Sequence, residues 1–80
     1  MTVETLTLAV RYSLVLTWDD QDRIYVASCP ELPGCNTHAA TRAEALANGE
    51  QAIAEWLDIA AEQGWIVPAP RVYGDVAVAV

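Results

Sequence analysis

The sequence lacks lysine altogether and has little positive charge of any kind. Its four basic residues are arginines, against eleven acidic residues, and the formal net charge is −7 at pH 7. Nucleic-acid-binding domains usually present a basic stripe, and anionic membrane surfaces also attract positive charge. The charge balance therefore predicts no direct DNA binding and no membrane association. It favours a basic protein as partner, the alternative being that acidity only maintains solubility.

Long hydrophobic runs and targeting signals are also missing. No apolar run reaches the ~18 residues that a membrane-spanning helix needs. The start of the chain, Met1 to Glu4, has no basic region and no cleavage site of the kind found in secretory signals. These features predict a cytoplasmic location. In that compartment Cys29 and Cys35 are expected to stay reduced, so the two thiols do not indicate a disulfide framework.

The chain is too short to bury a large core. Its 80 residues predict one domain that spans 1–80, and such a domain buries only about 60% of the surface that its unfolded form exposes. Yet 54% of the residues are apolar, and three are tryptophan. Self-association into a homo-oligomer is therefore expected, because a shared interface covers apolar surface that the monomer core cannot hold.

Alternating apolar residues in the first third of the chain predict a strand hairpin. Apolar side chains occupy the even positions from Leu6 to Trp18, which is typical of a half-buried strand. The acidic stretch Asp19–Asp22 predicts a polar turn. A second alternating segment, Arg23–Ser28, completes an antiparallel pair. Further on, Pro33-Gly34 predicts a type II turn with glycine at positive φ, followed by a short third strand over Cys35–Ala39.

One long helix is predicted after this turn. Thr41 and Glu44 have the spacing of a capping box, and Gly64 suits the C-terminal cap. Gly49 lies in the middle of the helix at a cost of about 1 kcal/mol relative to alanine, and a close approach of the helix to the sheet would explain it. The residues expected to form the buried stripe are Leu46, Gly49, Ile53, Trp56, Leu57 and Ala60.

The C-terminal part predicts a linker and a fourth strand. Val67–Pro70 contains two prolines and is expected to be extended. Valines then recur at alternate positions, which predicts a strand that joins the sheet or pairs with another subunit. The valines concerned are Val72, Val76, Val78 and Val80.

Reactive and metal-binding centres are not indicated by the residue pattern. Cys29, Cys35 and His38 fall short of the four ligands of a structural zinc site, and proximity in sequence does not make a nucleophile and base pair. The acids of the Asp19–Asp22 turn lack the glycine and the flanking helices of a calcium loop. The expectation is a protein without metal, without cofactor and without catalytic residues. Two aromatic residues, Tyr25 and Trp56, are either core or interface positions.

Several segments in the middle of the chain form a pattern by their order and spacing. These are Tyr25–Cys35, Thr41–Asn48, Ala52-Ile53, Trp56-Leu57, Gln63-Gly64 and Pro68–Pro70. Together they resemble the HicB family of bacterial antitoxins, and the resemblance runs from about Tyr12 to Pro70, three quarters of the chain.

The resemblance implies an α+β domain with the order β-β-β-α-β, in which one long helix packs on one face of an antiparallel sheet, similar to a degenerate ribonuclease H fold. It implies that the protein neutralises a small basic HicA-type ribonuclease that cleaves messenger RNA, and that it forms dimers or tetramers. Members of the family usually carry a C-terminal DNA-binding module, which this sequence is not expected to supply. The alternative is an orphan homo-oligomer with a structural or regulatory role. The residues expected to contact the partner are Asp19, Asp20, Asp22, Tyr25, Glu31 and Trp56.

Overall fold

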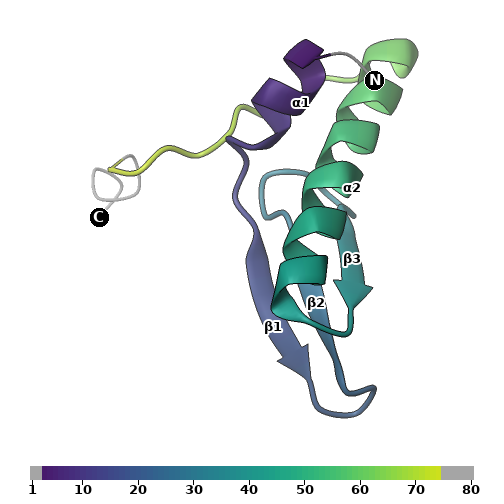
Figure 1. Cartoon of the computed structure of the whole chain (residues 1–80). Helices are drawn as coiled ribbons and strands as arrows, with labels where there is room; N and C mark the ends of the chain where they lie inside the picture. The colour runs from purple at the N-terminus through teal and green to yellow at the C-terminus, as the bar shows by residue number, and fades with distance from the viewer. Residues whose placement is uncertain (1–2, 75–80) are drawn as a thin grey trace.

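The fold is a three-stranded antiparallel sheet with a long helix on one face. A computed structural model describes residues 3–74. The elements are α1 (Val3–Ala9), β1 (Val15–Asp19), β2 (Ile24–Ser28), β3 (Asn36–Ala39) and α2 (Arg42–Gln63). The strands lie in the order β1-β2-β3, and α2 crosses one side of them while α1 packs beside the C-terminal half of α2 (Figure 1). This arrangement confirms the α+β class and the order of three antiparallel strands before one long helix.

The strand register decides which side chains face α2. Ala27 of β2 lies opposite Leu16 of β1 and Thr37 of β3, so these residues share one face of the sheet. Ala27 is fully buried under the helix. The alternate positions, among them Val26 and His38, lie on the other face, which no described helix covers (Figure 1). The second and third strands were predicted to within one residue at both ends, whereas the first strand was predicted to within one residue only at its C-terminal end.

Both ends of α2 follow the predicted capping. The Thr41 hydroxyl accepts a hydrogen bond from the backbone N–H of Glu44 at 3.2 Å. At the other end Gly64 adopts the left-handed conformation at φ 70°, and the N–H of Trp65 donates to the Ala60 carbonyl at 2.9 Å. The Pro33-Gly34 turn is also confirmed, with Gly34 at φ 75° and a bond from the Cys35 N–H to the Leu32 carbonyl.

Gly49 marks the closest approach of α2 to the sheet, as its position in the helix predicted. A β-carbon built on Gly49 would lie 2.9 Å from the terminal carbons of Leu14 and 3.3 Å from the β-carbon of Ala27. The leucine end can shift, whereas the alanine β-carbon is fixed to the backbone of β2. Small side chains on both sides therefore set the spacing between helix and sheet.

The prediction of a strand from Leu6 to Trp18 was wrong over its N-terminal part. Residues Val3–Ala9 form helix α1, and β1 begins only at Val15. The same residues also contain a helical repeat, in which Thr5, Ala9 and Tyr12 lie on one side. Ala9 and Tyr12 are buried, and the Thr5 hydroxyl bonds to the Asp58 carboxylate of α2 at 3.3 Å. Docking against α2 decides between the two periodicities, which a local pattern cannot do.

The buried stripe of α2 was predicted correctly at four of its six positions. Gly49, Ile53, Leu57 and Ala60 are buried, whereas Trp56 is half-buried and Leu46 is 45% exposed. Ala45 is fully buried there, in a cluster with Ala27 and Ala39. Ala45 occupies the position that faces the sheet. The next residue, Leu46, therefore points to one side of it and stays partly exposed.

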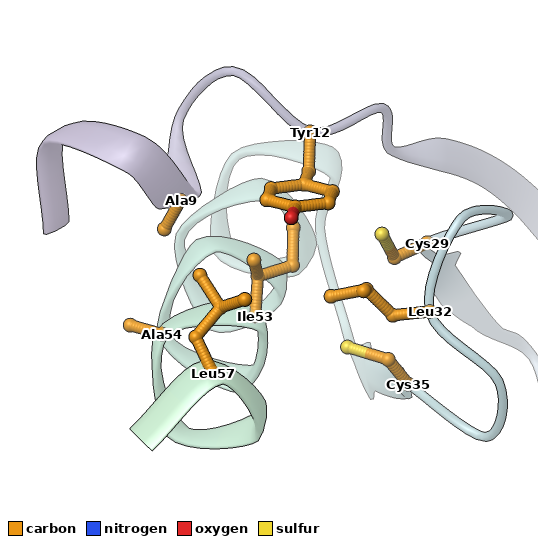
Figure 2. Packing of buried hydrophobic residues seen from close by; sticks show 8 residues of the cluster. All are labelled: Ala9, Tyr12, Cys29, Leu32, Cys35, Ile53, Ala54 and Leu57. Carbon is orange, nitrogen blue, oxygen red and sulfur yellow. The ribbon is translucent and has the colours of Figure 1, made fainter. Parts of the chain in front are cut away.

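The larger core lies between α1, α2 and the loop that joins β2 to β3. Figure 2 shows the loop residues pointing toward the α2 side chains, with the Tyr12 ring over the same space. Leu32 and Ile53 are the largest fully buried side chains of the described residues. The members of this cluster are Ala9, Tyr12, Cys29, Leu32, Cys35, Ile53, Ala54 and Leu57.

The chain after α2 is irregular as far as the structure describes it. The Tyr12 hydroxyl donates to the Pro68 carbonyl at 2.6 Å and so fixes the proline segment beside α1. Of the predicted fourth strand, Val72 lies in irregular structure, and Val76, Val78 and Val80 lie outside the described residues. Within residues 3–74 no helix is long and apolar enough to cross a membrane.

Replacing Gly49 tests the close contact between helix and sheet. Gly49→Val should lower the free energy of unfolding by roughly 1–3 kcal/mol, because the added atoms have no space beside Ala27. Ala47→Val, on the exposed side of the same helix, controls for helix propensity and should cost only about 0.5 kcal/mol. Urea unfolding followed by circular dichroism measures both. Equal losses in the two variants would contradict the close packing.

Candidate partner-binding site

A rigid acidic turn lies at the tip of the β1–β2 hairpin. The Asp19 carboxylate accepts hydrogen bonds from the backbone N–H groups of Gln21 at 3.0 Å and Asp22 at 3.1 Å. Arg23 closes the turn in the left-handed region at φ 57°, and its N–H donates to the Asp19 carbonyl at 2.7 Å. Asp19 thus shapes the turn, while the side chains of Asp20 and Asp22 are exposed to solvent.

An aromatic pair adjoins these acids. Trp18 of β1 and Tyr25 of β2 are cross-strand neighbours, and their rings meet edge to face with centroids 5.0 Å apart. The Trp18 indole N–H donates to the Asp20 carboxylate at 3.3 Å. Trp18 is still 44% exposed, because the hairpin extends beyond the first turn of α2 (Figure 1). We call Trp18, Asp20, Asp22 and Tyr25 the hairpin-tip surface.

The hairpin-tip surface suits a cationic side chain. Exposed tryptophan faces attract guanidinium and ammonium groups, and neighbouring carboxylates add charge-assisted hydrogen bonds. The chain already makes such a contact internally, since the Arg42 guanidinium lies 5.6 Å from the centre of the Tyr25 ring. The free faces around Trp18 and the two exposed carboxylates can accept a second cation from outside.

The predicted contact residues separate into two groups in space. Asp19, Asp20, Asp22 and Tyr25 come together at the hairpin tip, where Asp19 has an internal role. Trp18 completes this group and was missed by the sequence reasoning. Its signal was available, because an aromatic residue ends the alternating strand directly before the acidic turn.

Trp56 lies away from the hairpin tip and serves the fold. Its indole N–H donates to the Pro33 carbonyl at 3.1 Å, which ties the β2–β3 loop to α2. Its ring also meets that of Trp65 edge to face at 5.7 Å. The side chain is half-buried. These contacts are those of a packing residue at the border of the core.

Glu31 is a buried junction between three chain segments. Its side chain is only 8% exposed, and one carboxylate oxygen accepts the backbone N–H groups of Ser13 and Arg71, each at 3.0 Å. The Cys29 thiol points to the other oxygen at 3.9 Å. The carboxylate therefore holds together the α1–β1 connection, the β2–β3 loop and the segment after α2.

The hydrogen bonds outweigh the cost of burying this charge. Burial by itself raises the pKa of Glu31, but the N–H groups of Arg71 and Ser13 favour the ionised form and lower the pKa below its ordinary value. A lowered pKa means that the folded state binds the proton more weakly than the unfolded state. The resulting stabilisation is present above the unfolded pKa of about 4.5 and is lost as the pH falls through the folded value.

The cysteines and the histidine do not form a reactive group. Burial raises the pKa of the Cys29 thiol, and burial with the neighbouring Cys29 raises the pKa of Cys35 to about 11. Both are therefore protonated thiols at neutral pH. His38 is exposed and pairs in register with Val26, on the sheet face away from α2. In residues 3–74 no three His, Cys, Asp or Glu side chains are grouped to hold a metal ion.

Removing the charge of Glu31 tests the junction. Glu31→Gln should lower the free energy of unfolding at pH 7 by about 1–3 kcal/mol, because the amide is a weaker acceptor and leaves buried groups poorly satisfied. The difference from wild type should shrink as the pH falls from about 4.5 through the lower pKa of the folded state, because the unfolded state takes up the proton first and the native carboxyl only below its lowered pKa. Urea titrations between pH 3 and 7 give this comparison. A difference that stays constant with pH would remove the charge from the explanation.

Comparisons with known proteins identify the family of this chain. The family described as HicB_like antitoxin of bacterial toxin-antitoxin system matches residues 12–78. The chain is also similar to the UPF0150 protein Ta0767 of Thermoplasma acidophilum, with 39% identity over 49 residues, 61% of this chain and 70% of that protein. No solved structure matches the chain. Since the family match covers most of the sequence, the chain belongs to the HicB-like antitoxins of bacterial toxin–antitoxin systems.

Proposed function

We propose that this protein neutralises a small basic HicA-type ribonuclease that cleaves messenger RNA, by binding it directly. Membership of the antitoxin family gives the general role, and such antitoxins are not typically enzymes. The observation that carries the proposal is the hairpin-tip surface, where an exposed tryptophan lies beside two exposed carboxylates. The protein acts by occupying a surface of the toxin, and it needs no catalytic group.

The chemistry of the partner explains why an acidic surface suits it. An enzyme that holds messenger RNA needs cationic side chains that contact the phosphate backbone. An arginine of this kind can stack on Trp18 and pair with Asp20 or Asp22. Tryptophan and arginine are the residue types that most often dominate binding energy at protein interfaces. The antitoxin would then compete with RNA for the same cations.

A second group of acids supports the approach of a basic partner. Glu44, Glu55 and Glu62 are all exposed and recur at helical spacing on the solvent side of α2. Together with the turn acids they extend the negative potential along the molecule. Such a field raises the rate of association with a basic protein more than it raises the final affinity.

We also propose that the protein works in the cytoplasm, where messenger RNA is the toxin's substrate, and that it is a homo-dimer or tetramer. The apolar excess of the sequence supports self-association, because large aliphatic and aromatic side chains remain exposed in the described chain. Val10, Trp65 and Val72 are each more than half exposed. An interface between copies would cover such residues.

Truncating Trp18 tests the proposed contact with the toxin. Trp18→Ala should weaken binding to the HicA-type toxin by about 30-fold or more, the effect of losing a central tryptophan anchor. Trp65→Ala is the control, because Trp65 is similarly exposed and follows the C-terminal end of α2, which lies at the other end of the molecule from the hairpin turn (Figure 1). Calorimetric titration with the toxin encoded beside this chain in its native genome measures both affinities.

Substituting the turn acids separates charge from packing. Asp20→Asn together with Asp22→Asn should slow association several-fold at low salt and flatten its dependence on ionic strength. Ribonuclease activity on a labelled messenger RNA gives the functional readout. If an excess of the wild-type protein does not reduce cleavage by the toxin and yet sediments as a stable oligomer, the protein does not neutralise that toxin. The alternative function, an orphan homo-oligomer, is then favoured.

A further inference from the structure

The outer side of α1 carries the helix's large aliphatic residues. Within α1 itself, the side toward α2 contains Thr5 and Ala9, which are polar or small, and the large buried residue on that side, Tyr12, follows the helix. By contrast, Val3 is 79% exposed and Val10 is 61% exposed on the opposite side. An isolated surface helix normally buries its aliphatic stripe and exposes its polar one. The reversed distribution indicates that another surface covers the outer side of α1.

Charged residues stand at the two ends of this exposed side. Glu4 lies in the first turn of α1, and Arg11 lies two residues past its end, where the Arg11 N–H donates to the Leu8 carbonyl at 3.0 Å. Their spacing of seven residues corresponds to about two helical turns, or roughly 10.5 Å. A hollow of about 250 Å³ lies between them. We call the following residues the α1 outer face: Val3, Glu4, Thr7, Leu8, Val10 and Arg11.

The apolar surface continues beyond the helix. Arg11 also borders a second hollow of about 410 Å³, whose wall is the segment Pro70–Tyr73. Val72 is 62% exposed, and Tyr73 is fully exposed. A stable protein interface needs about 800 Å² from each partner, more than a helix of seven residues supplies alone. The adjoining segment provides the additional area.

The order of the charges selects a second copy of the chain as the partner. When two identical helices pack antiparallel about a twofold axis that passes between Thr7 and Leu8, Glu4 of each copy lies beside the partner's Arg11. The interface is then complementary to itself, as twofold symmetry requires. A parallel arrangement would place like charges together and is disfavoured.

We propose that two copies of this chain dimerise through the α1 outer face, with their α1 helices antiparallel and two symmetric Glu4–Arg11 pairs across the axis. The inference deepens the self-association in the proposed function by naming its surface. It does not require the toxin. Arg11 and Arg71, two of the four arginines, lie at this end of the molecule, which makes it a poor surface for a basic toxin.

The dimer leaves the hairpin-tip surface free. The hairpin turn and α1 lie at opposite ends of the molecule (Figure 1). A second copy on α1 and a toxin on the hairpin can therefore be bound at the same time. A dimer of this kind carries two acidic hairpin tips, one on each copy.

Charge reversal at the two ends of α1 tests the dimer. Wild type should sediment as a dimer, and Glu4→Arg or Arg11→Glu alone should raise the dimer dissociation constant by about tenfold or more, because each creates two like-charge pairs. An equimolar mixture of the two single variants should form a heterodimer, since every facing pair is again of opposite sign. The double variant Glu4→Arg with Arg11→Glu should regain the homodimer.

Two controls make this experiment decisive. Asp22→Arg and Arg23→Glu carry the same charge changes in the exposed hairpin turn and should leave the dimer unchanged. Circular dichroism checks that each variant is folded. Two results would overturn the proposal. One is a wild-type protein that stays monomeric at 100 times the concentration used for sedimentation. The other is a dimer whose dissociation constant changes in neither of the two α1 variants. Toxin binding is measured separately, so a chain that dimerises without binding toxin contradicts only the proposed function.

Discussion

Helix α2 packs on the sheet through the smallest side chains of the chain. This close contact determines how the remaining elements pack. A β-carbon on Gly49 would lie only 3.3 Å from that of Ala27, and Ala45 meets Ala39 beside it. This close contact aligns the helix with the hairpin and lets three short strands form a stable layer. It also means that this half of the core contains little apolar volume. The larger side chains are concentrated at the other end, around Leu32 and Ile53.

The division of the core has consequences for the surface. At the hairpin end the sheet extends past the helix, so Trp18 and Tyr25 are only partly covered and lie beside carboxylates. At the α1 end the chain exposes aliphatic residues with balanced charge. The two proposed interactions, with a basic toxin and with a second copy, therefore use opposite ends of the molecule. The buried core occupies only the space between these ends, so the two proposals are compatible.

The sequence predicted those features that depend on local chemistry. The Thr41 cap, the positive φ of Gly34 and the left-handed Gly64 each follow from what one residue type does to the backbone, and the hairpin follows from strict alternation. Helix α1 was missed because Leu6, Leu8 and Val10 fit a strand while Thr5 and Ala9 fit a helix. Only packing against α2 chooses between them. Glu31 was assigned to the surface, since no local pattern shows that the amides of Ser13 and Arg71 converge on it.

A basic toxin bound at the hairpin tip would shield the backbone there, and amide hydrogen exchange with and without toxin measures this shielding. Exchange over residues 18–25 should be slower in the complex, and exchange over residues 3–11 should be unchanged when both samples are dimeric. Protection confined to residues 3–11, or no protection anywhere in the chain at saturating toxin, would contradict binding at the hairpin tip.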